Sequence, residues 1–555
     1  MDYLKPLKSL PTHDVNNIPP YMGDQNLWLD DTNLREAVKR EGAGWAENNL
    51  KAFGKLMGKT DMFDHADRAN KNSPELKAFD RYGQRINFIE YHPSYHYLLR
   101  TAIENEIPNF AWNNKSKGSQ VAHMALTYIF NQVEGGVMCP MSMTYSVIPA
   151  LKYNEELKKE WLPRVLSKIY DDRDIPANLK KGATIGMFMT EKQGGSDIRT
   201  NSTKAKPISS SRGNGKEYYL TGHKYFCSAP MCDAFLVLGY SSGGLSCFLV
   251  PRWKPDGDRN NLFIQRLKDK LGNRSNASSE IELQDTFGIM IGDEGRGIKT
   301  ILDMVIGNRI YCTVSSASLM RQAVVQVLHH TTYRSAFQKK LIDQPLMKNV
   351  IADMILESDA AANLSMRVAR AFDYQEEDEN EKSIARICTT ISKYWITKRA
   401  PYLIFEALEC HGGAGYIEES IMPRLYREAP LNSIWEGSGN VMCVDVLRAI
   451  QKDKNAVPAV FNELEKSKGL NSNFDKNVEN LYLELKNPED LEIKSRYITE
   501  KLATLLQASI FLINCDEETA STFCNSRLGD DWTGAFGTLP ANTNFEKIIK
   551  RALPA

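Results

Sequence analysis

Apolar residues recur three and four positions apart along most of the first third of the chain, which is the spacing of amphipathic helices. The spacing is present at residues 34–38, 50–57, 94–104, 123–133 and 155–169. We therefore predict a helical domain over residues 33–181. The preceding residues, 1–32, are rich in Pro, Asn and Asp, and we predict an extended N-terminal arm for them.

At about residue 182 the hydrophobic period changes to two. Strand-like runs with turn residues between them follow at 218–226, 234–240, 245–251, 262–265 and 279–283. About a hundred residues of short strands are typical of a small barrel or sandwich set between other layers. We predict a middle β-barrel domain over residues 182–294.

The helical period returns at residue 295 and continues to about residue 450. The apolar segments lie at 301–306, 317–329, 346–372, 383–398 and 402–409, which is enough for a bundle of four or five helices. Beyond a polar link, residues 451–555 carry three more helical segments, at 481–485, 495–513 and 545–552. The predicted fold is an α+β multi-domain protein with a C-terminal helical extension.

Composition narrows the classes of function. The 555 residues exceed what one hydrophobic core supports. Lys+Arg and Asp+Glu both number 69, and this zero net charge gives no general attraction to nucleic acid or to a membrane surface. The ten cysteines form no Cys-x-x-Cys pair, so neither a metal site nor a disulfide framework is predicted.

No run of about 18 apolar residues is present, so we predict no membrane span. The first residues of the supplied chain show no clear targeting segment. The expected compartment is intracellular, either cytoplasmic or mitochondrial.

One carboxylate stands out, in the sequence Asn-Ser-Ile-Trp-Glu-Gly-Ser-Gly-Asn of residues 432–440. Glu436 follows the bulky Trp435, and the nearby Gly437 and Gly439 would let the backbone approach a ligand. Burial beside an aromatic wall would raise the pKa of this carboxyl toward neutrality, as a general base or acid requires. Taken alone, the stretch is more typical of a glycine-rich helix start with a solvated glutamate.

Three motifs change that balance. Residues 188–200 read Phe-Met-Thr-Glu-Lys-Gln-Gly-Gly-Ser-Asp-Ile-Arg-Thr, residues 409–419 read Glu-Cys-His-Gly-Gly-Ala-Gly-Tyr-Ile-Glu-Glu, and residues 435–438 read Trp-Glu-Gly-Ser. In this order and at these separations they resemble the motifs of the acyl-CoA dehydrogenase family. The resemblance covers residues 33–450, and within the family it is nearest to the AidB-like branch, whose additional C-terminal tail the extension also resembles.

The resemblance implies α,β-dehydrogenation of a fatty acyl-CoA thioester with FAD as cofactor. No side chain accepts a hydride, so a flavin has to supply that function. Glu436 would be the base that removes the α-proton. The position that carries the base in part of the family is Asn308 here, whose amide cannot remove a proton. In the family, the backbone N–H of the catalytic glutamate and a flavin ribityl hydroxyl hold the thioester oxygen.

The resemblance also implies the remaining site residues. Those expected to bind substrate are Ser196, Arg309, Trp435, Glu436 and Gly437. Those expected to bind the cofactor are Met187, Phe188, Met189, Thr190, Gly194, Gly195, Ser196, Phe226, Cys227, Ser228, Arg334, Phe337, Gly412, Gly413, Trp435, Gly437, Ser438 and Asn440.

In the family, the arginine at the position of Arg334 reaches the cofactor diphosphate of a neighbouring subunit. A homodimer or a homotetramer built as a dimer of dimers is therefore expected, with electron-transfer flavoprotein as a candidate partner. The chain departs from the family at Gln338, where glycine is usual, and at Ile306, where an acid is common. These departures concern contacts to CoA and the shape of the acyl site more than flavin binding.

Two alternatives to an active dehydrogenase remain open at this point. One is a flavin-containing protein that binds acyl-CoA or fatty acid for sequestration or regulation, with little turnover. The other is a nucleic-acid-associated protein, as suggested for the AidB-like branch. The extension, residues 451–555, has 13 Lys/Arg against 16 Asp/Glu, which argues against a nucleic-acid surface there.

Overall fold

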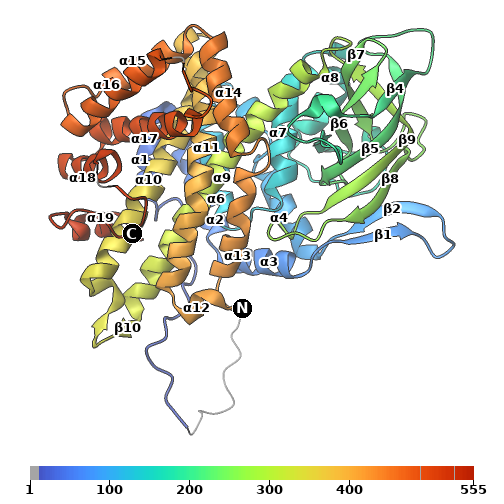
Figure 1. Ribbon diagram of the computed structural model, residues 1–555. Coiled ribbons are helices and arrows are strands. Elements are labelled where there is room, and N and C mark those ends of the chain that lie inside the picture. Colours follow the sequence, from blue (N-terminus) through green and yellow to red (C-terminus); the bar gives the residue numbers. More distant parts are fainter. Residues whose placement is uncertain (1–11, 488, 531, 555) are drawn as a thin grey trace.

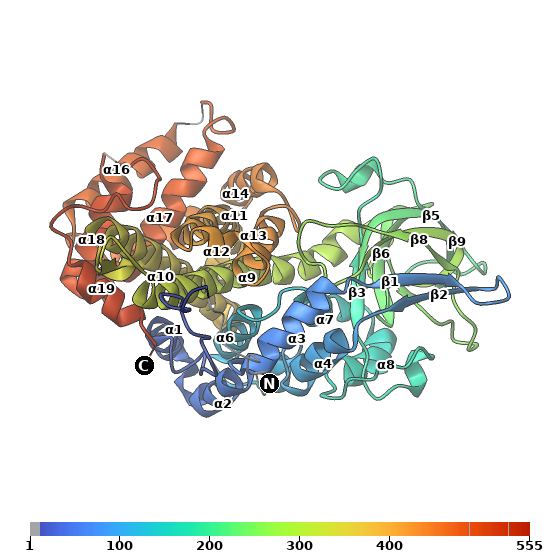
Figure 2. The same ribbon diagram turned by 90° about the horizontal axis from the view of Figure 1, so that it is seen from below.

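The computed structural model describes residues 12–487, 489–530 and 532–554. A β-barrel forms one side of the molecule and long helices fill the rest (Figure 1). Seen from below, helices of the N-terminal third lie along one edge of both parts (Figure 2). Residues 1–11 of the predicted arm lie outside the described residues.

The N-terminal third is mainly helical. The start of α4 at Pro93 illustrates the local logic: proline fits the first turn, and the side chain of His92 accepts a hydrogen bond from Ser94 N. The helices are α1 (Thr32–Val38), α2 (Glu47–Met57), α3 (Thr60–Lys71), α4 (Pro93–Glu104), α5 (Phe110–Asn113), α6 (Ser119–Asn131), α7 (Met138–Leu151) and α8 (Glu155–Val165).

A β-hairpin interrupts this helical region, which the sequence analysis did not predict. Strand β1 (Glu75–Phe79) pairs antiparallel with β2 (Arg85–Glu90). Asn87 donates its side-chain amide to Leu262 O at 2.9 Å, so the hairpin is attached to strand β8 (Leu262–Leu267) of the barrel (Figure 2). The turn, where Asp80 accepts from Tyr82 N, is the local signal that could have revealed it.

The middle part is a closed, mainly antiparallel barrel, which confirms the predicted fold class. Its sheet order is β3-β6-β4-β5-β9-β7; β7 also pairs with β6, which closes the barrel, and β8 pairs with β9. The strands are β3 (Ile185–Phe188), β4 (Lys204–Pro207), β5 (Glu217–Ser228), β6 (Ala234–Ser241), β7 (Gly244–Pro251), β8 (Leu262–Leu267) and β9 (Ser278–Ile291).

Long helices form the C-terminal bundle. The predicted segments 301–306 and 317–329 belong to one helix, α9 (Gly297–Tyr333). Most of α9 is buried on all sides, so its sequence lacks the polar stripe that marks a surface helix. Pro401 lies inside α11 (Glu379–Cys410), and the helix continues through it while packing against α9 and α10. The other elements are β10 (Ser335–Ala336), β11 (Lys339–Lys340), α10 (Pro345–Tyr374), α12 (Gly413–Tyr416), α13 (Met422–Glu428) and α14 (Gly439–Lys452).

The C-terminal extension packs on α10 and α11 and shares their core (Figure 1). Arg527 pairs with Asp353 and Glu357 of α10, and all three side chains are buried. The extension consists of α15 (Ala456–Glu465), α16 (Ser472–Lys486), α17 (Ser495–Asn514), α18 (Glu517–Leu528) and α19 (Phe545–Ala552). Among the described helices, none is both long and apolar enough to cross a membrane.

Candidate active site

A cavity of about 650 Å³ lies where the barrel meets α7, α9 and the segment between α13 and α14. Its volume is in the range of sites that hold a cofactor or a substrate of comparable size. The walls are mostly apolar, with a small number of polar side chains. The predicted site residues that line it are Met187, Met189, Thr190, Gly195, Ser196, Phe226, Ser228, Arg309, Trp435, Glu436, Gly437 and Ser438.

Glu436 lies in the turn between a short 3₁₀ segment (Ala429–Ser433) and α14. Its backbone is left-handed, with φ of 57°, and Gly437 follows with φ of 107°. Oε1 is 3.4 Å from the side-chain amide of Asn308, while Oε2 is buried and has no hydrogen-bond partner within the described part of the chain. A buried oxygen without a partner on a cavity wall indicates that a ligand completes its environment.

Burial raises the pKa of Glu436 to about 7, although the charges of Arg309 and Lys393 and the hydrogen bond from Asn308 act to lower it. A carboxyl with this pKa can exchange a proton near neutral pH. The backbone N–H of Glu436 donates to no other group of the described chain. One residue therefore offers both an acid–base group and a free donor to the cavity.

Two cations hold the turn that carries Glu436. Lys393 of α11 donates from Nζ to Trp435 O at 2.9 Å and to Gly437 O, and Arg309 of α9 donates from Nε to Glu436 O at 3.1 Å. Arg309 is itself fixed by Asp445, whose Oδ2 lies 2.7 Å from Nη1. Arg309 thus lines the cavity and also forms an ion pair between α9 and α14, the alternative to a substrate contact that the sequence had left open.

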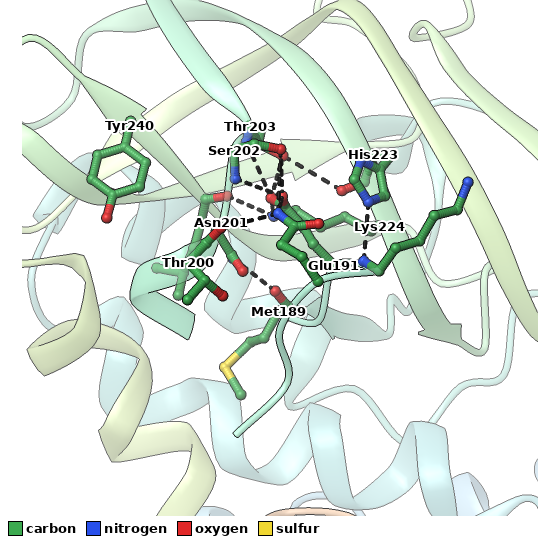
Figure 3. A network of polar contacts seen from close by, with 12 residues as sticks. Met189, Glu191, Thr200, Asn201, Ser202, Thr203, His223, Lys224 and Tyr240 are labelled. Atoms are coloured by element: carbon green, nitrogen blue, oxygen red, sulfur yellow. Dashed lines mark hydrogen bonds and ion pairs between the residues drawn. The ribbon is translucent and has the colours of Figure 1, made fainter. Parts of the chain in front are cut away.

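The loop after β3 is built around a buried ion pair (Figure 3). Lys224 Nζ donates to Glu191 Oε1 at 2.7 Å, and both side chains are fully buried. The same carboxylate accepts from Thr203 Oγ1 at 2.5 Å and from Ser202 N at 2.6 Å. Burial alone would raise the pKa of Glu191, but Lys224 and the hydrogen bonds lower it to about 2. The network ties residue 191 to residues 202–203 and so closes the loop that presents Thr190, Gly195 and Ser196 to the cavity.

Four other predicted residues lie behind the cavity wall or beside it. Phe188 is buried against Phe235, with ring centroids 4.0 Å apart, and Cys227 is buried in β5. Gly194 faces inward, because a Cβ there would come within 2.1 Å of Thr200 Oγ1. Asn440 is exposed and accepts from Arg496 Nε of the extension at 2.8 Å. None of the four is among the residues that line the cavity.

The remaining predicted residues meet at the far end of α9. Arg334 donates from Nη1 to Asn17 O at 2.7 Å, and Phe337 is 93% exposed. His330 and His411 lie with ring centroids 4.6 Å apart, which brings Gly412 and Gly413 to the same end. Arg334 follows Leu319, the last residue of α9 that lines the cavity, by 15 residues, or about 22 Å along a helix, so its side chain does not reach the cavity of its own chain.

Several polar residues of the site have no role predicted from the sequence. Lys270 and Glu428 line the cavity, and burial lowers the pKa of Lys270 to about 8 and raises that of Glu428 to about 7. Lys393 approaches from the middle of α11. Glu428 follows the second motif at the spacing that the family resemblance predicts, whereas Lys270 and Lys393 come from distant parts of the chain and lie in none of the three motifs.

Comparison with known proteins agrees with this architecture. Three family models match the chain: the AidB N-terminal domain over residues 17–172, the acyl-CoA dehydrogenase middle domain over residues 186–286 and the acyl-CoA dehydrogenase C-terminal domain over residues 295–451. AidB of Escherichia coli is 41% identical over 506 residues, which cover 91% of each chain. The chain therefore belongs to the acyl-CoA dehydrogenase family and, within it, to the AidB-like branch.

Solved structures support the same assignment. Caenorhabditis elegans ACDH-11, solved in complex with C11-CoA, superposes with a TM-score of 0.85 at 25% identity over 96% of both chains. A Bacillus anthracis acyl-CoA dehydrogenase complexed with FAD shares the fold, with a TM-score of 0.62 at 18% identity over 83% of this chain and 85% of that one. FAD is the cofactor that membership of the acyl-CoA dehydrogenase family indicates, in agreement with the prediction from the sequence.

Proposed function

We propose that this protein is an FAD-dependent acyl-CoA dehydrogenase that forms a double bond between the α and β carbons of a fatty acyl-CoA thioester, with Glu436 as the base. The observation that carries the proposal is the Glu436 carboxyl: it lines the 650 Å³ cavity, its Oε2 has no partner within the described chain, and its pKa is about 7. Family membership supports an oxidoreductase; the specific reaction is our inference.

The cavity suits FAD on the grounds of its own residues. Thr190, Ser196 and Ser228 supply hydroxyls on the barrel side, and Gly195 leaves room for a close approach. On the opposite wall, the buried Glu436 Oε2 without a hydrogen-bond partner in the described chain supports a bound ligand as well. When bound, FAD supplies the acceptor for the β-hydride, a role that no side chain can perform.

The chain's own groups account for the proton transfer. With a pKa of about 7, Glu436 is substantially ionised at neutral pH and takes the α-proton onto its carboxylate. Negative charge then develops on the thioester oxygen, and the free N–H of Glu436 can donate to that oxygen. Trp435, anchored by its Nε1 hydrogen bond to Asn432 Oδ1 at 2.9 Å, closes the wall beside the reacting carbons and excludes water.

We further propose that Arg334 and Phe337 contribute to the cofactor site of a neighbouring subunit, in a homodimer or homotetramer. The support is their position: they lie together at an exposed end of α9, beyond reach of their own cavity. Electron-transfer flavoprotein remains the candidate acceptor for the electrons.

A second candidate function is binding of a fatty acyl-CoA with little turnover. It is favoured by the ACDH-11 structure, in which a relative of the same fold holds C11-CoA. The two functions differ in what the purified protein contains. A retained saturated acyl ligand beside oxidised FAD, identified by mass spectrometry, would support binding over turnover.

Anaerobic flavin bleaching tests the proposal. Saturated acyl-CoAs of increasing chain length are added to the holoprotein, and absorbance of the oxidised flavin is followed. At least one chain length should bleach the flavin, and the Glu436→Gln variant should retain FAD but lose bleaching by at least about a thousandfold, because an amide cannot accept the proton. Lys382→Met, at an exposed site on α11, is the control expected to bleach like the wild type. An oxidised flavin with every acyl-CoA would contradict the proposal.

A further inference from the structure

The turn at Glu436 is held by an unusual set of donors. The carbonyl oxygens of three consecutive residues, Trp435, Glu436 and Gly437, accept hydrogen bonds from two cationic side chains on two different helices. Arg309 holds the middle carbonyl and Lys393 holds the two outer ones. Buried backbone carbonyls usually accept hydrogen bonds from backbone N–H groups, whereas these three accept from side chains.

The hydrogen-bond partners of Lys393 Nζ in the described chain are the carbonyl oxygens of Trp435 and Gly437. The Lys393 side chain is fully buried, and no carboxylate of the described chain lies within salt-bridge distance of Nζ. Arg309, by contrast, has Asp445 as a counter-ion. Burying an ammonium without a paired carboxylate is costly, and the carbonyls of Trp435 and Gly437 are the hydrogen-bond partners that offset this cost in the described chain.

The backbone explains that need. Glu436 has φ of 57°, a conformation that residues with a side chain adopt rarely and only when surrounding contacts enforce it. Gly437 follows with φ of 107°, so two consecutive residues of the turn have left-handed backbone. Without donors on both sides, the turn would relax and the carboxyl would leave its place on the cavity wall.

We propose that Lys393 is a positioning residue of the active site, which holds the carbonyls of Trp435 and Gly437 and thereby keeps Glu436 in the left-handed turn that directs its carboxyl and N–H to the substrate. The inference rests on the proposed function in that Glu436 is taken as the base. Its geometric content, the coupling of Lys393 to the Glu436 carboxyl, holds whether or not the protein turns over.

Lys393 also acts through its charge, which lowers the pKa of Glu436 against the larger effect of burial. The charged and titratable groups around Glu436 are Arg309 and Cys312 of α9, Lys393 of α11 and Cys139 of α7. Burial lowers the pKa of Lys393 itself to about 8, so it remains mostly charged at neutral pH. Loss of this charge should therefore raise the pKa of the base.

The test titrates the carboxyl directly. In the FAD-loaded protein, the infrared C=O band of protonated Glu436 is assigned by its absence in Glu436→Gln and is followed against pH. In Lys393→Met, which has similar volume but neither charge nor donor, the midpoint should rise by about one pH unit. In Lys393→Gln, which keeps N–H donors, the midpoint should rise similarly. The exposed Lys382→Met should leave it unchanged.

Bleaching by an acyl-CoA supplies the second readout. Lys393→Met should slow bleaching at neutral pH at least tenfold, while Lys393→Gln should retain more of the rate because it can still hold one or both carbonyls. If Lys393→Met does not fold, Lys393→Gln alone decides the infrared comparison. A wild-type midpoint in the folded variants would overturn the inference. If the wild type itself never bleaches, the proposed function fails, and the infrared titration still decides the role of Lys393.

Discussion

At the scale of single residues, the Glu436 carboxyl is buried, and burial makes its ionisation costly. Burial raises the pKa of Glu436 from 4.5 to about 7, so between these values the folded chain holds a proton that the unfolded chain has lost. The contribution of this group to the free energy of unfolding therefore falls as pH rises through that window. The raised pKa that suits Glu436 to act as a base near neutral pH therefore also lowers the stability of the folded protein above that pH.

Glu436→Gln should accordingly stabilise the protein above the window. We expect its free energy of unfolding in urea to exceed that of the wild type by on the order of 2 kcal/mol at pH 8, with little difference at pH 4.5. Glu418→Gln is the matched control, because a hydrogen bond from Arg427 lowers the pKa of Glu418 and its removal should not stabilise. Equal stabilities of wild type and Glu436→Gln at pH 8 would show that the carboxyl is not desolvated.

How much of the site the sequence could predict depends on the residue. Glu436, Trp435 and the residues after β3 could be named because they lie in contiguous motifs. Lys393 could not, because it contacts the turn across more than forty residues and stands in an ordinary helical segment. Phe188 and Gly194 belong to a motif, yet they support the loop from behind, a distinction that only three-dimensional packing provides.

At the scale of elements, the loop after β3 depends on the Glu191–Lys224 pair beneath it (Figure 3). Lys224→Met would leave a buried carboxylate without its counter-ion, which typically costs about 3–5 kcal/mol. We expect lower stability in urea and weaker FAD binding by fluorescence titration. The double variant Lys224→Met with Glu191→Gln should recover part of the stability, since it removes both charges. Unchanged FAD affinity in a folded Lys224→Met would contradict the role of the pair in shaping the loop.

Helices and strands that bury one face show a hydrophobic period and could be predicted from the sequence, whereas elements without such a period were predicted in part or missed. Helix α9 was predicted only in pieces, because a helix buried all round shows no period. The β1–β2 hairpin was missed because its strands are short and half-exposed, so the surrounding helical pattern dominated. In the extension, α15 and α18 were missed, and α18 is built largely of small and polar residues.

At the scale of the whole molecule, the exposed end of α9 distinguishes a monomer from an assembly. If Phe337 docks on a second subunit, Phe337→Asp should dissociate the oligomer and release FAD, because a carboxylate cannot be buried in an apolar interface without a partner. Light scattering and the flavin-to-protein ratio measure both effects. Leu483→Asp, at an exposed position of α16, is the control expected to change neither. An unaltered mass and FAD content for Phe337→Asp would remove this end of α9 from the cofactor site.

The central claim is that Glu436 takes the α-proton of a bound acyl thioester, and deuterium exchange tests it most directly. A saturated acyl-CoA is incubated anaerobically with the FAD-loaded protein in D₂O, and the recovered thioester is analysed by mass spectrometry. We predict deuterium at the α carbon with the wild type and none with Glu436→Gln. Equal incorporation by both proteins, or none by the wild type with any chain length that binds, would contradict the account.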